Sequence, residues 1–233
     1  MDETVDLIAK RIRKRKFTQH VVVNVAKIVH AQKDKQLAAS MAACHIINID
    51  GMGVVWGARI LGVCIPERVS GVDLFGNLVE MAACEKFPIF LLGATDVVVS
   101  SVSVKLQELH TELIIAGFHH GYFWDDEAAI VKRIRDSGAR MLFVAITSPK
   151  KENFINRWKD QLGVDFVMGV GGTFDVVAGK VRRAPVWMQR AGMEWLYRVI
   201  QEPTRMWKRY LVTNSIFAVM LVRALIAGPK QAQ

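Results

Sequence analysis

The sequence has few cysteines and lacks the motifs that mark common nucleotide and metal sites. Its three cysteines, Cys44, Cys64 and Cys84, have no CxxC spacing, so a disulfide framework is disfavoured and reduced thiols in a cytosol are expected. There is no GxxxxGK[ST] loop, HExxH, DxD pair or clustered Cys/His set. P-loop nucleotidases and metal-held nucleotide sites are therefore disfavoured, and we expect neither a metal nor a cofactor.

The sequence shows no internal repeat at a fixed period and no low-complexity tract. We also expect no cleavable signal peptide, because acidic residues and then a basic run precede any apolar stretch. The 233 residues, of which 52% are hydrophobic, suffice to bury one sizeable core. We expect one main domain over residues 1–190, followed by an appendage over 191–233.

Positive charge is plentiful and unevenly placed in a chain of formal net charge +9. Six basic residues fall within 10–16, and residues 180–233 hold ten against only Glu194 and Glu202. These ends predict attraction to phosphate groups or to an anionic membrane surface. For the N-terminal run, a solvated helix face is an equally good explanation.

Apolar runs rich in β-branched residues alternate with helix-length stretches, which is typical of a mainly parallel sheet with helices on both faces. The predicted strands are 20–25, 44–49, 87–93, 112–117, 140–146 and 164–170, and the predicted helices are 26–39, 73–86, 96–109, 126–137 and 150–162. We expect an α/β, Rossmann-like domain whose ligands collect at the carboxyl ends of the strands, with a C-terminal helical appendage.

Several of these strands end in polar residues or glycines that packing does not explain. Glycines at such turns let the backbone approach a ligand, and helix N-terminal amides favour phosphate. Each signal alone is more often turn chemistry, but their repetition favours a phosphate-bearing ligand. The residues are Asn24, Asp50, Gly51, Gly53, Gly93, Gly117, Gly121, Gly169, Gly171, Gly172 and Asp175. For His119 and His120, a loop or packing role is favoured over metal binding.

Eight blocks, taken in order, resemble the TagA/WecG/CpsF family of bacterial glycosyltransferases over about residues 18–210. They are Asn24, DGMGVVW (50–56), ERVSGVDL (67–74), FLLG (90–93), GYF (121–123), SPKKENFI (148–155), GVGGTFDVVAGKVRRAP (169–185) and MEWLYRVIQEPTRMWKRY (193–210). The resemblance implies inverting, metal-independent transfer of a sugar from a UDP-sugar to a polyprenyl-diphosphate-linked acceptor.

The resemblance also assigns roles to residues. Asp50 matches the carboxylate that takes the proton from the acceptor hydroxyl, although it could instead cap the helix that starts near Met52. Arg68 matches an arginine that could stabilise the UDP leaving group, although Glu67 could hold it in a structural pair. Asn24 corresponds to another pocket residue, a hydrogen-bond partner for sugar or phosphate. Looser assignments to the nucleotide-sugar site are Gly93, Gly171, Gly172 and Asp175, and Gly51 and Glu152 are also expected to bind substrate.

Two departures from the family pattern bear on the donor sugar. Val22 stands where the family usually has threonine, and Lys151 replaces the glutamine of a PKQE motif. We expect Lys151 to meet a negative group, either the donor diphosphate or a sugar carboxylate. The family uses N-acetylmannosamine, its uronic acid and glucose-type donors, and the sequence does not choose among them.

The C-terminal segment matches an appendage that closes over the active site and carries cations, here Arg198, Arg205 and Lys208, toward the lipid diphosphate. Pro203 predicts two short helices with a joint at Glu202-Pro203. The apolar stretch 211–227 is seventeen residues long and is interrupted by Asn214 and Arg223. This length favours a helix that lies in the membrane interface or packs on a partner subunit over one that crosses the bilayer. We therefore expect a peripheral protein on the cytoplasmic face of the bacterial inner membrane.

Two other functions compete with this reading. A nucleic-acid-binding protein would use the basic ends and interleaved aromatics, but it would leave Asp50 and the glycine turns unexplained, so we expect no nucleic acid partner. A non-catalytic scaffold of a polysaccharide assembly complex would fit the departures at Val22 and Lys151. A homo-oligomer is left open.

Overall fold

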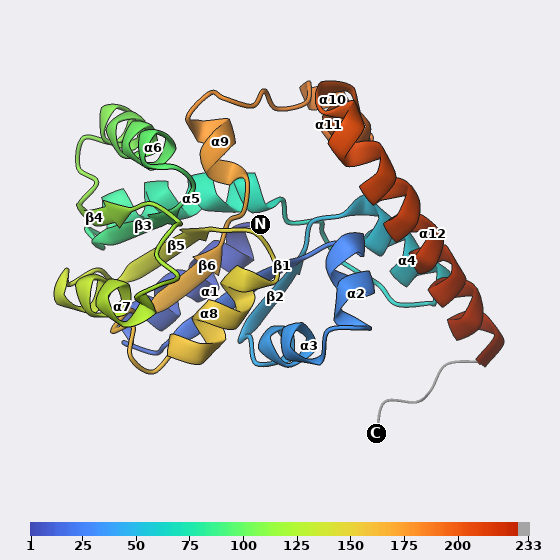
Figure 1. Cartoon of the computed structure of the whole chain (residues 1–233), viewed down its shortest axis with the longest axis horizontal. Helices are drawn as coiled ribbons and strands as arrows, with labels where there is room; N and C mark the ends of the chain where they lie inside the picture. The colour runs from blue at the N-terminus through green and yellow to red at the C-terminus, as the bar shows by residue number, and fades with distance from the viewer. Residues whose placement is uncertain (228–233) are drawn as a thin grey trace.

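The computed structural model describes residues 1–227 and shows a parallel sheet between helical layers (Figure 1). Its strands are β1 (Thr18–Val23), β2 (Ile46–Ile49), β3 (Ile89–Gly93), β4 (Ile115–His119), β5 (Met141–Ala145) and β6 (Phe166–Gly169). They lie in the order β2-β1-β6-β5-β3-β4, and every neighbouring pair is parallel. The α/β, Rossmann-like fold is confirmed, and each predicted strand overlaps one of these.

Helices connect the strands. They are α1 (Asp2–Arg13), α2 (Val25–Ala31), α3 (Lys35–Ala42), α4 (Met52–Ile60), α5 (Gly71–Cys84), α6 (Asp96–Leu109), α7 (Glu127–Asp136), α8 (Lys150–Trp158), α9 (Thr173–Val177), α10 (Val186–Arg190), α11 (Glu194–Gln201) and α12 (Pro203–Ala227). The helix predicted over 26–39 is two helices, because the Asp34 side chain accepts a 2.9 Å hydrogen bond from the Leu37 amide and starts a new one.

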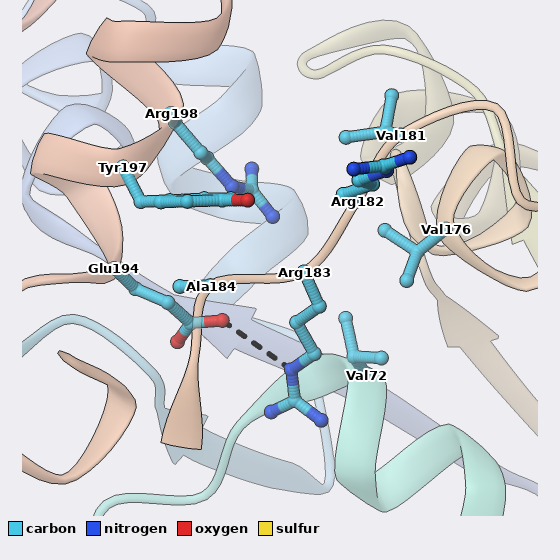
Figure 2. A pocket seen from close by; sticks show the side chains of 9 residues that line it. All are labelled: Val72, Val176, Val181, Arg182, Arg183, Ala184, Glu194, Tyr197 and Arg198. Atoms are coloured by element: carbon cyan, nitrogen blue, oxygen red, sulfur yellow. Dashed lines mark hydrogen bonds and ion pairs between the residues drawn. The ribbon is translucent and has the colours of Figure 1, made fainter. Parts of the chain in front are cut away.

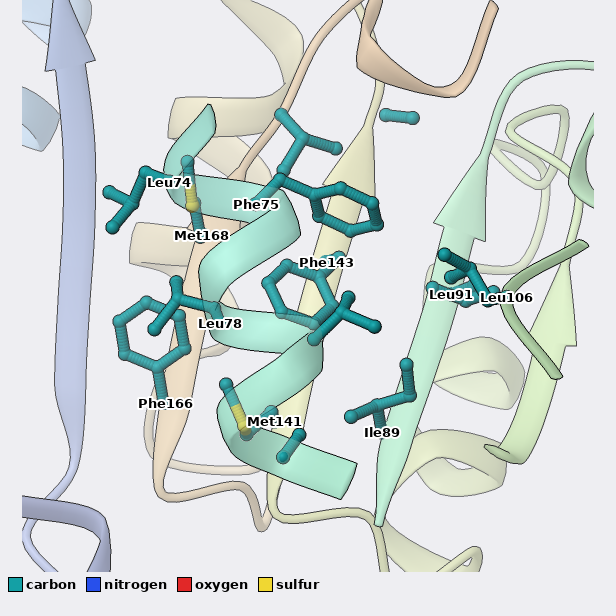
Figure 3. Close-up of a cluster of buried hydrophobic side chains, with 14 of the residues drawn as sticks. Leu74, Phe75, Leu78, Ile89, Leu91, Leu106, Met141, Phe143, Phe166 and Met168 are labelled. Atoms are coloured by element: carbon teal, nitrogen blue, oxygen red, sulfur yellow. The ribbon is translucent and has the colours of Figure 1, made fainter. Parts of the chain in front are cut away.

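The core lies on both faces of the sheet because successive side chains of a strand point to opposite sides. In β3, Ile89 and Leu91 face a cluster with α1, α5, α6 and α9, whereas Phe90 and Leu92 face α7 and α8. Figure 3 shows the first cluster, where the Phe75 ring of α5 meets the Phe143 ring of β5 edge-on at 4.8 Å. The edge strands β2 and β4 are only half-buried, so the near-continuous burial expected of a parallel sheet holds for the four central strands.

The three arginines of the basic run near the N-terminus are engaged in the fold. Arg11 donates to the Thr18 hydroxyl at 2.6 Å, Arg13 donates through Nε to Glu85 at 3.1 Å, and Arg15 pairs with Asp165 at 3.4 Å. Ile8 and Ile12 on the other side of α1 are fully buried. These contacts give the run a structural use at the amino edge of the sheet.

The C-terminal segment forms α11 and α12, with the predicted joint at Glu202-Pro203. The second helix is not short, since it runs through Ala227 and lies beside α2 and α4 (Figure 1). Phe217 and Leu221 approach so closely that a Cβ at Gly57 would lie 2.9 and 3.1 Å from their side chains. Residues 228–233 of the expected appendage fall outside the described residues.

Candidate active site

Asp50 lies directly after β2, where the carboxyl edge of the sheet meets the start of α4. Its amide donates to the Val23 carbonyl at 3.0 Å, which continues the β1–β2 ladder and fixes the backbone. The expected alternative, a cap on α4, is wrong, because Gly51 holds that position. Instead the Asp50 Oδ2 accepts a 3.4 Å hydrogen bond from the amide of Gly71, the first residue of α5.

The surroundings of Asp50 suit a proton acceptor. Burial raises the pKa of the Asp50 carboxyl, and the Arg68 guanidinium and the Gly71 amide oppose that rise. Glu194 raises the same pKa further, and Arg198 lowers it. A buried carboxylate with a raised pKa is a stronger base than a solvated one, and such groups cluster at functional sites.

Arg68 acts electrostatically on this carboxylate, and it is not held by Glu67. Glu67 contacts the amino group of Met1. Arg68 instead pairs through Nη2 with Oε2 of Glu194 at 3.3 Å, and both side chains are about four-fifths buried. The expected alternative pair is therefore wrong, and the residue that engages Arg68 comes from the appendage.

Arg183 is a second guanidinium at this site, and the sequence reading gave it no role. Its Nε lies 3.4 Å from Oε1 of the same Glu194. Its Nη2 donates to Asp73 at 2.6 Å and to the Ser70 hydroxyl at 3.3 Å, which fixes the plane of the guanidinium at the start of α5. Only its place in the GVGGTFDVVAGKVRRAP block could have drawn attention to it.

A narrow pocket opens among these side chains (Figure 2). Its lining residues are Val72, Val176, Val181, Arg182, Arg183, Ala184, Glu194, Tyr197 and Arg198, so α5, α9, α11 and the segment between α9 and α10 contribute. Its volume of about 10 Å³ is room for about one water molecule. The appendage therefore closes this part of the site.

The expected cations of the appendage go to different places. Arg198 lines the pocket and acts electrostatically on Asp50. Lys208 lies exposed, 5.8 Å from the ring centroid of Trp207. Arg205 belongs to α12, but its side chain lies outside the described part of the chain. The Glu202-Pro203 joint separates Arg198 from the other two, so the three do not follow one helical repeat.

Comparison with known proteins decides the family. A model of the glycosyl transferase WecG/TagA/CpsF family matches residues 1–231. This chain belongs to that family. It is 36% identical over 181 residues, 78% of this chain and 70% of the relative, to an N-acetylglucosaminyldiphosphoundecaprenol N-acetyl-beta-D-mannosaminyltransferase of Bacillus subtilis (strain 168). A protein of that name from Bacillus spizizenii (strain ATCC 23059 / NRRL B-14472 / W23) is 32% identical over 200 residues, 85% of this chain and 77% of the relative.

In this WecG/TagA/CpsF glycosyltransferase, Lys151 is buried and paired with its neighbour Glu152. The Glu152 Oε1 lies 2.9 Å from the Nζ of Lys27 and 3.2 Å from the Nζ of Lys151. Burial and the Lys27 charge lower the pKa of Lys151 to about 8. Burial alone would raise the pKa of Glu152, but the positive charges of Lys151 and Lys27 outweigh burial and lower this pKa to about 2. The cluster holds two cations and one anion, and sequence reasoning missed Lys27.

Asn24 joins this cluster to the Asp50 site. Its Oδ1 accepts a 3.0 Å hydrogen bond from the Lys27 amide and caps α2. A Cβ at Gly51 would lie 3.4 Å from the Cβ of Asn24. The structure therefore places Asn24 next to the turn that carries Asp50, on which Arg68 acts electrostatically, and their roles stay predictions.

The glycines of the predicted nucleotide site differ in what requires them. At Gly93, φ is +125° and a Cβ would lie 2.4 Å from the Ala145 carbonyl oxygen, so packing of β3 on β5 alone demands glycine there. Gly171 and Gly172 face open space between β6 and α9, although Gly171 also has a left-handed φ of +56°, and Asp175 follows on α9. That loop leaves room for a ligand.

His119 and His120 lie at the end of β4, five strands away from β2 in the sheet order. The Nδ1 of His119 is 2.9 Å from the His120 carbonyl oxygen, and the two rings lie 4.1 Å apart. They line a wider hollow with Tyr122 and Arg133. Within residues 1–227, no three His, Cys, Asp or Glu side chains gather as a metal site, and metal independence stays a prediction.

An apolar surface flanks the site along α4 and α12. Met206–Ala227 is long and apolar enough to cross a membrane, so the expectation based on seventeen apolar residues underestimated this helix. Among the described side chains of that stretch, only Met206 and Thr213 are buried. The exposed large side chains are Trp56, Ile60, Leu61, Val63, Trp187, Trp195, Ile200, Trp207, Leu211, Val212, Val219, Val222, Leu225 and Ile226.

Proposed function

We propose that this glycosyltransferase moves a sugar from a UDP-sugar to a polyprenyl-diphosphate-linked glycan, with inversion and without a catalytic metal. The observation that carries the proposal is the largely buried carboxylate of Asp50, whose pKa is raised by burial, an effect that the charges of Arg68 and Arg198 oppose. The two relatives are named for transfer to an N-acetylglucosaminyldiphosphoundecaprenol, which supports a lipid-diphosphate acceptor.

The chemistry follows from these charges. Asp50 accepts the proton of the acceptor hydroxyl while that oxygen attacks the anomeric carbon of the donor. The bond between the anomeric carbon and the UDP oxygen breaks on the opposite face, so the configuration inverts. Negative charge develops on the leaving diphosphate, and the fixed guanidinium of Arg68 stabilises it.

The donor would lie along the carboxyl edge of the sheet between the Asp50 site and the β6–α9 loop. Gly171 and Gly172 leave space for it, and Asp175 and Gly93 are the further candidates on that edge. Asn24 would meet it through the side-chain amide nitrogen, because Oδ1 is engaged in the cap of α2.

Lys151 is proposed to recognise a negative group of the donor through the excess positive charge of the cluster it forms with Lys27 and Glu152. Lys151→Gln should then raise the KM for the donor and leave the KM for the acceptor nearly unchanged. Lys150→Gln, at the exposed neighbouring position, is the matched control. An unaltered donor KM in Lys151→Gln would refute this role.

The acceptor approaches from the membrane. Arg198, Arg205 and Lys208 are proposed to hold its diphosphate, and the exposed tryptophans and aliphatic side chains of α4 and α12 to lie at the headgroup level of an anionic surface. Because α12 lies against α2 and α4, we propose that it lies along the cytoplasmic face of the inner membrane.

The test is release of UDP by the purified protein. The donors are UDP-linked N-acetylmannosamine, its uronic acid and glucose, the acceptor is a short-chain polyprenyl-diphosphate-sugar, and a chelator is present. Acceptor-dependent release from one donor should be lost in Asp50→Asn and kept in Asp96→Asn, an exposed control on α6. Full turnover by Asp50→Asn would refute its role as the base. Silence across the panel with vesicle binding intact would favour a non-catalytic scaffold.

A further inference from the structure

The carboxylate of Glu194 lies between two guanidinium groups, one on each oxygen. Its Oε2 is 3.3 Å from Arg68 and its Oε1 is 3.4 Å from Arg183. We propose that Arg68 and Arg183 form the diphosphate-binding subsite of the donor, that Glu194 fills it when the donor is absent, and that the donor displaces it. This inference rests on the proposed function for the identity of the ligand.

Glu194 contacts both guanidinium groups, but at distances too long for strong charge-assisted hydrogen bonds. Charge-assisted bonds between nitrogen and a carboxylate are usually about 2.7–2.9 Å long, and both contacts here are longer. One carboxylate is shared between two guanidinia, and Arg183 is held on its other side by the Asp73 carboxylate. A diphosphate carries more charge and more oxygens, so it can give Arg68 and the Nε edge of Arg183 shorter contacts than Glu194 does.

Arg183 is built to stay in place while its ligand changes. Asp73 and Ser70 hold its Nη2 from the side of α5, so the Nε edge remains directed at Glu194 (Figure 2). These bonds, together with the Glu194 carboxylate, raise the pKa of Arg183 and keep it charged. The guanidinium is thus preorganised, and only its partner from the appendage has to move.

Displacement of the Glu194 carboxylate frees the start of the appendage from Arg68 and Arg183, because Glu194 is the first residue of α11. The pocket beside it has room for about one water molecule, so a diphosphate cannot enter while the carboxylate stays. The helix follows a turn at Gly192, where φ is +73°, and it contacts α12. Binding of the donor therefore shifts the helix that carries Arg198, which the acceptor needs.

The test measures binding of inorganic pyrophosphate and of UDP by calorimetry. Glu194→Gln keeps the shape of the side chain and removes the competing charge, and should tighten both ligands by roughly three- to tenfold. Glu67→Gln is the matched control, because Glu67 precedes Arg68 in the chain but contacts the amino group of Met1. This variant should bind pyrophosphate and UDP with the affinity of wild type. A merely structural role for Glu194 would weaken binding.

Hydrogen exchange supplies a second readout. Pyrophosphate should speed exchange of the amides of 194–201 in wild type, and these amides should exchange faster in Glu194→Gln before any ligand is added. Unchanged or weaker affinity in Glu194→Gln, slower exchange on binding, or no pyrophosphate binding by either protein would each overturn the inference. Tighter binding without sugar transfer would instead refute the proposed function and keep the anion site.

Discussion

The buried cluster of Lys27, Lys151 and Glu152 allows a sharp test of what holds the carboxyl edge of the sheet together. Glu152 is the single anion between two ammonium groups, and only 4% of its side chain is exposed. Glu152→Gln would leave both cations buried without a countercharge. Lys151→Gln would remove the ammonium group that the Lys27 charge repels, and it would keep the 2.9 Å ion pair between Lys27 and Glu152.

The distances set the magnitude. At an effective dielectric constant of about 20, each of these contacts carries about 5 to 6 kcal/mol of gross attraction, most of which offsets the desolvation of the charges. Removing one partner of a buried pair costs about 3 to 5 kcal/mol, so Glu152→Gln should lower the free energy of unfolding by that amount. Lys151→Gln leaves Glu152 paired with Lys27, so no buried charge loses its only partner and the change should be no more than about 1 kcal/mol.

Urea unfolding followed by circular dichroism at pH 7 and at several values up to pH 10 measures both effects. The pKa of Lys151 is lowered to about 8 by burial and Lys27, from an ordinary 10.5. Between these values the unfolded chain binds more protons at this group, so wild-type stability should rise with pH relative to Lys151→Gln. Equal stability of Glu152→Gln and Lys151→Gln at pH 7 would refute this account of the cluster.

Two further predictions concern the Asp50 site and the sheet. The acid limb of the pH profile of kcat/KM should lie above the ordinary range of an aspartate, because activity is lost as pH falls through the raised pKa of Asp50. Arg68→Gln should move this acid limb to higher pH, and Glu194→Gln should move it to lower pH. An acid limb that stays in place in both variants would contradict this. Gly93→Ala should lower the free energy of unfolding by about 2 kcal/mol or more, because its Cβ would meet the Ala145 carbonyl oxygen at 2.4 Å, and a thermal melt that matches wild type would contradict it.

The strands could be predicted from the sequence because their signal is local. A run such as 140–146 is apolar throughout, and the central strands are buried on both faces. The helix over 26–39 was mispredicted because apolar spacing does not show the break that Asp34 makes as a cap. The length of α12 was underestimated because the apolar count started at 211, whereas the helix begins at Pro203.

Site residues could be proposed from the sequence only where a local feature, such as the end of a strand, marks them. Asp50 and Asn24 follow strands directly, and the sheet brings strand ends together. Arg183 and Glu194 were missed because their partners lie far away in sequence, 110 residues from Arg183 to Asp73 and 126 from Glu194 to Arg68. No local pattern reports which of many charged residues will meet across such distances.

The position of the apolar surface relative to Asp50 supports the proposed approach of a lipid-linked acceptor. Trp56 and Ile60 are exposed on the helix that begins just after Asp50, six and ten residues further on, and a helix rises about 1.5 Å per residue. The carboxylate thus lies about 9 to 15 Å along α4 from side chains suited to enter lipid. A headgroup layer is about 5 to 8 Å thick, so a lipid-linked acceptor whose carrier enters at these side chains would have its sugar within reach of Asp50. The engaged basic run of α1 lies at the opposite edge of the sheet, so the cations that meet the membrane should be those of the appendage.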